Sequence, residues 1–250
     1  MRQLPLAVRL NDAARFENYL PGPNAAVLAE VMALTGPPRP GLFWLCGPKG
    51  SGKTHLLQAL CARAGDDAVY LPVSQLAPFG SAALAEWQGG TEWGGGTERR
   101  GGRWLCLDDV ALAVGRADWE RALFGLYRDA EERGASLLVA ARESPTELPF
   151  ALADMRSRCA AGHRLVLRAL NETEQCAALT LRARQRGFEL PTETAQFLMR
   201  RLDRDMSSLF AVLDELDAAA LAAQRPLTVP FIRSVLAQRA ARPKSSAPFQ

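Results

Sequence analysis

The feature that most constrains this chain is the segment 47–54, which reads G-P-K-G-S-G-K-T and fits the phosphate-loop pattern G-x-x-x-x-G-K-[S/T]. An apolar run at 41–46 precedes it and an apolar, helix-like run at 55–61 follows it, as a strand–loop–helix unit requires. Glycines let backbone N–H groups turn toward phosphate oxygens, and the N-terminus of the following helix adds partial positive charge. We therefore predict nucleotide binding; a plain glycine turn is the alternative.

Within this loop the pattern assigns different roles to different side chains. Lys53 is predicted to reach the β- and γ-phosphate positions, and the hydroxyl of Thr54 to bind magnesium. The predicted nucleotide-binding residues of the loop are Gly47, Pro48, Lys49, Gly50, Ser51, Gly52, Lys53, Thr54 and His55.

A second informative stretch is 103–110, where an apolar run ends in two adjacent acids, Asp108 and Asp109. In a phosphate-loop nucleotidase one carboxylate holds magnesium, directly or through water, and its neighbour orients or polarises the attacking water. We predict Asp108, with Thr54, as the metal-binding pair and Asp109 as a catalytic residue. The alternative is a strand that simply ends in an Asp-Asp turn.

Residues from about 10 to 168 alternate apolar strands with helices, which predicts a parallel α/β sheet with ligands at the carboxyl ends of its strands. The predicted strands are 41–46, 68–73, 103–110, 136–142 and 164–167, and the clearest helices are 25–34, capped by Asn24, and 119–133. Between them, 89–102 holds seven glycines in fourteen positions. This segment is expected to be a mobile loop.

From residue 171 onward the pattern becomes entirely helical. Asn171 with Glu174 three residues on forms a capping box, and further helices are predicted at 192–202, at 204–223 and from 228. Short turns join the four, as in a small helical bundle.

Composition limits the class of protein and the redox compartment that this chain indicates. A net charge of +3 with 48% apolar residues neither requires nor excludes nucleic acid, and no run of 18 apolar residues or signal-peptide core is present. The five cysteines are odd in number and include no C-x-x-C pair. Reduced core thiols in a cytoplasmic protein are therefore expected.

Together these features resemble the AAA+ ATPases and, more narrowly, their DnaA-related branch. The segments that carry the resemblance are 3–6 (Gln-Leu-Pro-Leu), 16–19 (Phe-Glu-Asn-Tyr), 47–55, 107–109, 181–191, 201–206 and 227–231. It extends over nearly the whole chain. It implies an N-terminal peptide at 1–10, an AAA+ nucleotide-binding α/β domain at 11–168, a helical lid domain at 169–240 and a disordered tail at 241–250.

The resemblance also implies roles for individual residues. In that family an N-terminal Q-L-x-L peptide docks on the DNA polymerase sliding clamp, which assigns clamp binding to Gln3, Leu4 and Leu6; an arm packed on its own domain is the alternative. The trans-acting arginine finger falls on Arg158, with Arg156 as its neighbour, although a structural ion pair is an alternative there. The sensor arginine of the lid, a further nucleotide contact, falls on Arg204, and the adenine pocket includes 16–22.

The function that the resemblance implies is negative regulation of replication initiation. Bound to the clamp and to ADP, the protein would stimulate ATP hydrolysis by DnaA, with ADP or ATP and Mg²⁺ as cofactors and DNA contacted only indirectly. Residues 140–142 (Ala-Ala-Arg) stand where relatives carry a polar or acidic sensor residue, which implies weak intrinsic hydrolysis. Self-association is also expected, because an arginine finger acts at a subunit boundary.

Three other functions are alternatives for a chain with these patterns. A helicase loader or another DnaA-like replication ATPase shares the same core, but the clamp-like peptide argues against it. An initiator would need a DNA-binding module after the lid helices, and only about ten residues follow them. A small-molecule kinase would need an acceptor pocket, which nothing in the sequence resembles.

Overall fold

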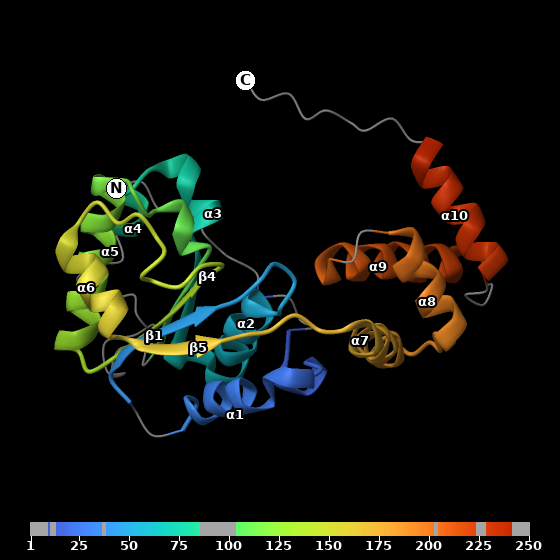
Figure 1. Ribbon diagram of the computed structural model, residues 1–250, viewed down its shortest axis with the longest axis horizontal. Helices are drawn as coiled ribbons and strands as arrows, with labels where there is room; N and C mark the ends of the chain where they lie inside the picture. Colours follow the sequence, from blue (N-terminus) through green and yellow to red (C-terminus); the bar gives the residue numbers. More distant parts are fainter. Residues whose placement is uncertain are drawn as a thin grey trace. The chain divides into compact units, whose positions relative to one another are not determined.

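The computed structural model describes residues 10, 14–36, 39–85, 104–202, 205–223 and 229–241 (Figure 1). The chain divides into two compact units, 1–170 and 171–250. Several predicted features lie outside the described residues: Gln3, Leu4, Leu6, the segment 89–102, Arg204 and the tail after residue 241. Within the described ranges, no helix is long and apolar enough to cross a membrane.

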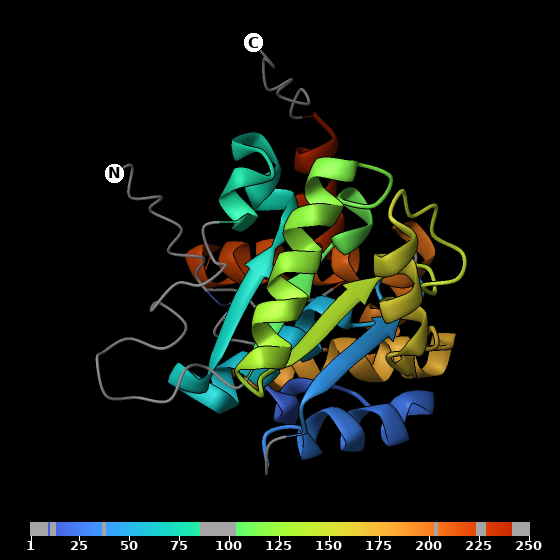
Figure 2. The same cartoon turned by 90° about the vertical axis from the view of Figure 1, so that its left-hand side faces the viewer.

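The first unit is built on a five-stranded sheet in the order β2-β3-β4-β1-β5, in which all neighbouring strands are parallel. Figure 2 shows the strand arrows pointing the same way, with α5 lying across the side that faces the viewer. The strands are β1 (Gly41–Cys46), β2 (Ala68–Pro72), β3 (Trp104–Asp108), β4 (Ser136–Ala141) and β5 (His163–Val166). Every residue of β3 and β4 is buried, as expected for strands covered on both faces. The predicted α/β class is confirmed.

Helices cover both faces of this sheet, and each face has its own hydrophobic core. One core contains residues of α1 (Ala25–Ala33) and α2 (Lys53–Ala64). The other contains residues of α3 (Val73–Leu76), α4 (Ala82–Ala85), α5 (Ala117–Glu132) and α6 (Ala153–Ala161). Strand β1 shows the division, because Trp44 lies in the second core and Leu45 in the first. Short 3₁₀ turns complete the unit: η1 (Phe16–Asn18), η2 (Gly22–Asn24), η3 (Gly65–Asp67), η4 (Ala77–Phe79) and η5 (Val110–Leu112).

Two local predictions for this unit are wrong. Strand β2 ends at Pro72, and Val73, predicted to end the strand, begins α3 with its side chain fully buried in the core. Asn24 precedes α1 as predicted, but its side chain does not cap the helix. It is 1% exposed and bonds instead to the backbone of Arg168, whose N–H lies 2.7 Å from Oδ1 and whose carbonyl lies 3.0 Å from Nδ2. Asn24 thereby satisfies both backbone groups of a residue two positions beyond β5.

The second unit contains α7 (Glu172–Gln185), α8 (Thr192–Arg201), α9 (Met206–Ala223) and α10 (Val229–Ala241). The capping box before α7 is present: Glu174 N donates to Asn171 Oδ1 over 2.9 Å, and Asn171 N donates to Glu174 Oε2 over 2.7 Å. Gly187 follows α7 with φ of 84°, the left-handed conformation that commonly closes a helix. The helical pattern predicted from residue 171 is confirmed.

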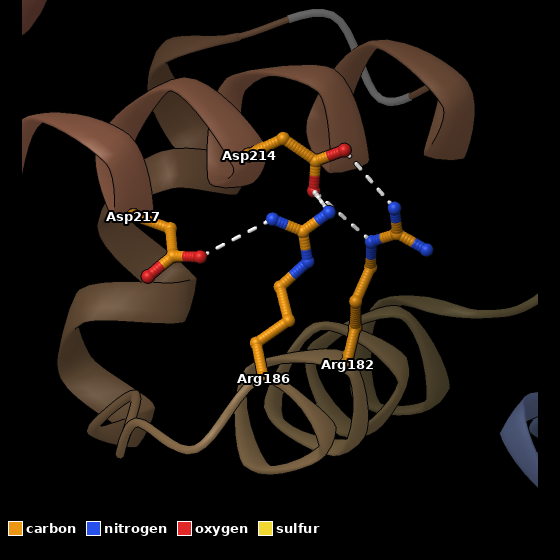
Figure 3. Close-up of polar contacts among 4 residues, drawn as sticks. All are labelled: Arg182, Arg186, Asp214 and Asp217. Carbon is orange, nitrogen blue, oxygen red and sulfur yellow. Dashed lines mark hydrogen bonds and ion pairs between the residues drawn. The ribbon is translucent and has the colours of Figure 1, made fainter. Parts of the chain in front are cut away.

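Ion pairs connect α7 to α9 within this unit (Figure 3). Asp214 receives Arg182 at both carboxylate oxygens, over 3.2 and 3.0 Å, and Arg186 over 3.0 Å. Arg186 also contacts Asp217 over 3.2 Å. The Arg182 side chain is only 15% exposed and stacks over Phe210 at 4.9 Å. This geometry is bidentate and partly dehydrated, so it stabilises more than a surface ion pair.

We expect Asp214→Ala to lower the free energy of opening α7 and α9 by about 1–2 kcal/mol, between the values for exposed and buried pairs. Amide hydrogen exchange in the two helices should then accelerate about 5–30-fold. Asp217→Ala is the matched control, because Asp217 holds one arginine by one contact, and should cost less than about 1 kcal/mol. Equal exchange in wild type and Asp214→Ala would show that the network does not stabilise the unit.

Candidate functional site

The segment 47–54 connects β1 to α2, and two of its glycines, Gly47 and Gly52, lie where a side chain would collide with neighbouring residues. A Cβ on Gly47 would lie 2.6 Å from the carbonyl oxygen and 2.9 Å from the Cβ of Leu167. A Cβ on Gly52, whose φ is +93°, would lie 2.5 Å from a ring carbon of Tyr19. The loop is therefore packed between the residue after β5 and the N-terminal segment, and only glycine permits both approaches.

The phosphate-facing part of the loop combines a lysine with a helix N-terminus. Lys53 Nζ donates to the carbonyl oxygens of Gly47 and Pro48 over 2.7 and 2.9 Å, so the ammonium lies over the loop. Burial lowers the pKa of Lys53, and the carboxylates of Asp108 and Asp109 oppose that shift. The first helical hydrogen bond of α2 runs from Leu56 N to Gly52 O. The N–H groups before it lie where a helix binds anions.

Tyr19 connects the predicted adenine-pocket segment to this loop. Its hydroxyl donates to the carbonyl oxygen of Ser51 over 3.1 Å, and burial raises the pKa of Tyr19 to about 12, so the hydroxyl keeps its proton. The Tyr19 ring also lies 5.6 Å from the His55 ring. His55 in turn places Nε2 2.8 Å from the Arg15 carbonyl oxygen. The Tyr19 side chain and the Arg15 backbone carbonyl thus border the loop, as a base-binding segment would.

Sheet order brings the loop and the acidic pair to one edge. β1 and β3 both pair with β4, so segment 47–54 and Asp108 lie beyond the carboxyl ends of strands that flank a single strand. Arg142 follows β4 at this edge, and its carbonyl oxygen accepts Gly47 N over 3.2 Å. This is the position at which parallel sheets bind ligands.

Asp108 is the buried member of the acidic pair, with 2% exposure. It accepts the Tyr70 hydroxyl over 2.8 Å, the Asp109 N–H over 3.0 Å and a hydrogen bond from the Thr54 side chain. Burial raises the pKa of Asp108, and the hydrogen bonds from Thr54 and Tyr70 oppose that rise.

The contact between Thr54 and Asp108 brings the two predicted magnesium ligands together, so the residues present fit the ion. No group of three or more His, Cys, Asp or Glu residues gathers into a metal site anywhere in the described part of the chain. A hydroxyl and a carboxylate nevertheless suit Mg²⁺, which takes its other ligands from water and substrate phosphates.

Asp109, predicted as catalytic, is exposed and adopts φ of 55°. Its Oδ2 accepts the Ser74 hydroxyl over 3.0 Å. No other non-glycine residue among those described has positive φ. Backbone strain of this kind gathers at functional sites.

Arg158 is not brought to this edge. It lies on α6, whose end leads into the start of β5, with its side chain 52% exposed. Its guanidinium contacts Tyr127 and Glu131 near the end of α5, on the face of the sheet opposite α2. That position corresponds to the amino edge of β1, and the six residues of β1, at about 3.3 Å each, span roughly 20 Å. Arg158 therefore lies far from the loop of its own chain.

A buried carboxylate that sequence patterns gave no reason to select fixes the start of α6. Glu120 is 0% exposed and accepts three backbone N–H groups. Gly115 N and Ala151 N reach Oε1 over 2.7 and 2.9 Å, and Leu152 N reaches Oε2 over 2.6 Å. Since α6 begins directly after Leu152, Glu120 sets the position of the helix that carries Arg158.

Comparisons with known proteins concern the fold and the second unit. A family model described as "Hda, lid domain" matches residues 172–236. Domain III of the Thermotoga maritima replication initiation protein DnaA matches with a TM-score of 0.75 at 20% identity, over 92% of this chain and 98% of that one. AMPPCP-bound DnaA from Aquifex aeolicus gives 0.65 at 18%, over 82% and 65% of the two chains. The Aeropyrum pernix ORC1 protein in complex with DNA gives 0.66 at 21%, over 92% and 68%. At these identities the likeness to solved structures shows a shared fold.

Proposed function

We propose that this chain, which is an AAA+ protein related to Hda and DnaA, binds an adenine nucleotide and stimulates ATP hydrolysis on a DnaA partner. Arg158 would reach the partner's ATP, while the nucleotide in loop 47–54, ADP in the active state, would fix the conformation of this chain. The consequence is negative regulation of replication initiation, because the partner loses its ATP. Hydrolysis by this chain itself would be weak.

The observation that carries the proposal is the placement of Arg158. The Arg158 side chain is 52% exposed, and its guanidinium lies at the end of the sheet opposite to loop 47–54. It is therefore poorly placed to act on its own nucleotide but accessible to a second molecule. An arginine supplied across a boundary stabilises the charge on a transferred phosphoryl group.

Nucleotide binding by this chain is supported by the loop geometry and by its relatives. The proposal is supported by the close packing of Gly47 and Gly52, the helix N-terminus at Lys53 and the Thr54–Asp108 contact, which would together bind phosphate and magnesium. The related Aquifex aeolicus DnaA is bound to AMPPCP. In this chain Lys53 would hold the phosphates, Thr54 and Asp108 would hold Mg²⁺, and the ion would neutralise phosphate charge.

Docking on the sliding clamp rests on segment 3–6, which supplies a glutamine for hydrogen bonds and two leucines for an apolar pocket. We expect Leu6→Ala to weaken clamp affinity at least about tenfold, as loss of an apolar anchor does. Pro5→Ala, at the unspecified position of the Q-L-x-L pattern, should bind like wild type. Surface plasmon resonance with immobilised clamp measures both.

The function itself is tested by DnaA ATP hydrolysis in the presence of this chain, ADP and clamp loaded on DNA. Stimulation should require the clamp, Leu6 and Arg158. Stimulation that survives both Leu6→Ala and Arg158→Ala would refute the proposal. Capture of the replicative helicase without any capture of the clamp would instead support the helicase-loader alternative.

A further inference from the structure

The exposed arginine of α6 rests on an aromatic ring. Arg158 Cζ lies 5.5 Å from the centroid of the Tyr127 ring, and its Nη1 lies 4.0 Å from Glu131 Oε1. Tyr127 and Glu131 are one turn apart on α5, and the Tyr127 hydroxyl donates to the same Glu131 oxygen over 3.3 Å. Three side chains from two helices thus form one closed cluster.

The ring has firm support on its other side. Tyr127 is partly buried and packs against the core that contains Trp119 and Leu123. It also borders a small cavity of about 90 Å³ together with Pro40 and Leu137. Because this core fixes the ring, the ring can order a side chain that would otherwise sample many rotamers.

The contacts of Arg158 with Tyr127 and with Glu131 differ in whether they compete with a bound phosphate. The guanidinium lies over the Tyr127 ring, 5.5 Å from its centroid, and in this position its N–H groups can still donate to phosphate oxygens. The Glu131 contact joins side chains that are 52% and 57% exposed at 4.0 Å, so it is weak. A phosphate can replace Glu131 while the ring contact persists.

We infer that Tyr127 is a positioning residue for Arg158: its ring holds the guanidinium in the orientation that enters the partner's nucleotide site. The inference rests on the proposed function of Arg158. An arginine that is already ordered loses less side-chain entropy when it docks, so the effect appears in the rate of the stimulated reaction. Glu131 is displaced from Arg158 on docking, and the core alone keeps the ring in place.

Tyr127→Leu should lower the maximal clamp-dependent rate of ATP hydrolysis by DnaA about 2–5-fold, which corresponds to the energy of an exposed cation–π contact. The concentration of this chain that gives half-maximal stimulation should change less than about twofold. Tyr127→Phe keeps the ring and should restore the wild-type rate, and Glu131→Gln should not lower it. In an Arg158→Ala background, Tyr127→Leu should have no further effect. Tyr127→Met replaces Tyr127→Leu if the leucine variant has a lower melting temperature.

A second readout does not depend on DnaA. In the purified protein the Arg158 Nε–H proton should show a ring-current shift that disappears in Tyr127→Leu and remains in Tyr127→Phe. If Arg158→Ala leaves stimulation intact, the proposed function fails, whatever the NMR result. If Arg158→Ala abolishes stimulation while Tyr127→Leu matches wild type, only the positioning role is overturned. If Tyr127→Leu lowers the stimulated rate by the same factor in wild type and in Arg158→Ala, the positioning role is also overturned. The ring would then act by stabilising the fold and not through Arg158.

Discussion

Replacing Arg158 with alanine should reduce the stimulated rate of ATP hydrolysis by DnaA by about 10³-fold or more, which is the size of an arginine-finger effect. The side chain is 52% exposed, and its contacts within the described part of the chain are with Tyr127 and Glu131, so its removal should leave the fold intact. Clamp affinity and ADP affinity should remain at wild-type values. Arg158→Lys keeps the charge but loses the planar fork, and it should recover little of the rate.

Arg156 provides a matched control on the same helix. It is exposed, and within the described part of the chain its side chain makes no hydrogen bond or ion pair. Arg156→Ala should therefore stimulate DnaA within about twofold of wild type, which is the range of a neutral surface change. A large loss in Arg156→Ala with a small loss in Arg158→Ala would assign the role to Arg156 instead. Single-turnover measurements at saturating concentrations of each variant distinguish a lower rate of hydrolysis from a lower affinity for DnaA.

Glu120→Gln should destabilise the first unit by about 2–4 kcal/mol. The buried carboxylate accepts three N–H groups with two oxygens, and the amide of glutamine must turn its own N–H toward one of them. Orienting the amide nitrogen toward Leu152 leaves that N–H without an acceptor at the start of α6. Stimulation of DnaA should fall as well, because α6 carries Arg158.

Urea unfolding followed by tryptophan fluorescence suits this measurement, because all five tryptophans lie in the first unit. Glu132→Gln is the control, since Glu132 is 66% exposed and pairs with Arg128 on its own helix. It should change stability by less than about 0.5 kcal/mol. Equal midpoints for the two variants would contradict the structural role of Glu120.

The α/β core and the helical second unit could be predicted because the signals that specify them lie within short stretches of sequence. The phosphate loop with its flanking strand and helix, the parallel alternation up to residue 168 and the capping box at Asn171 are each visible within a few residues. The α/β core and the helical second unit are accordingly confirmed. The prediction that Val73 ends a strand is wrong, because a buried β-branched residue is compatible with both a strand and the first turn of a helix.

The supporting contacts of the site could not be predicted in the same way. Asn24 meets Arg168 across 144 positions, Tyr70 meets Asp108 across 38, and Glu120 meets Leu152 across 32. Tyr70 is a neighbour of Asp108 because β2 pairs with β3, and the register of that pairing cannot be read from either strand alone. Asn24 was predicted only as a helix cap and Glu120 was not selected, because burial of a polar side chain leaves no periodic signal. The roles assigned to the loop residues, Asp109 and Arg158 remain predictions.

The most direct test is a single-turnover experiment that follows each nucleotide separately. DnaA is loaded with radiolabelled ATP, this chain with unlabelled ADP, and both are combined with clamp on DNA; the reciprocal experiment labels ATP on this chain and places ADP on DnaA. We predict rapid, clamp-dependent phosphate release from the DnaA-bound label and no stimulated release in the reciprocal arrangement. Rapid release from the label carried by this chain, with the DnaA-bound label unchanged, would contradict the account.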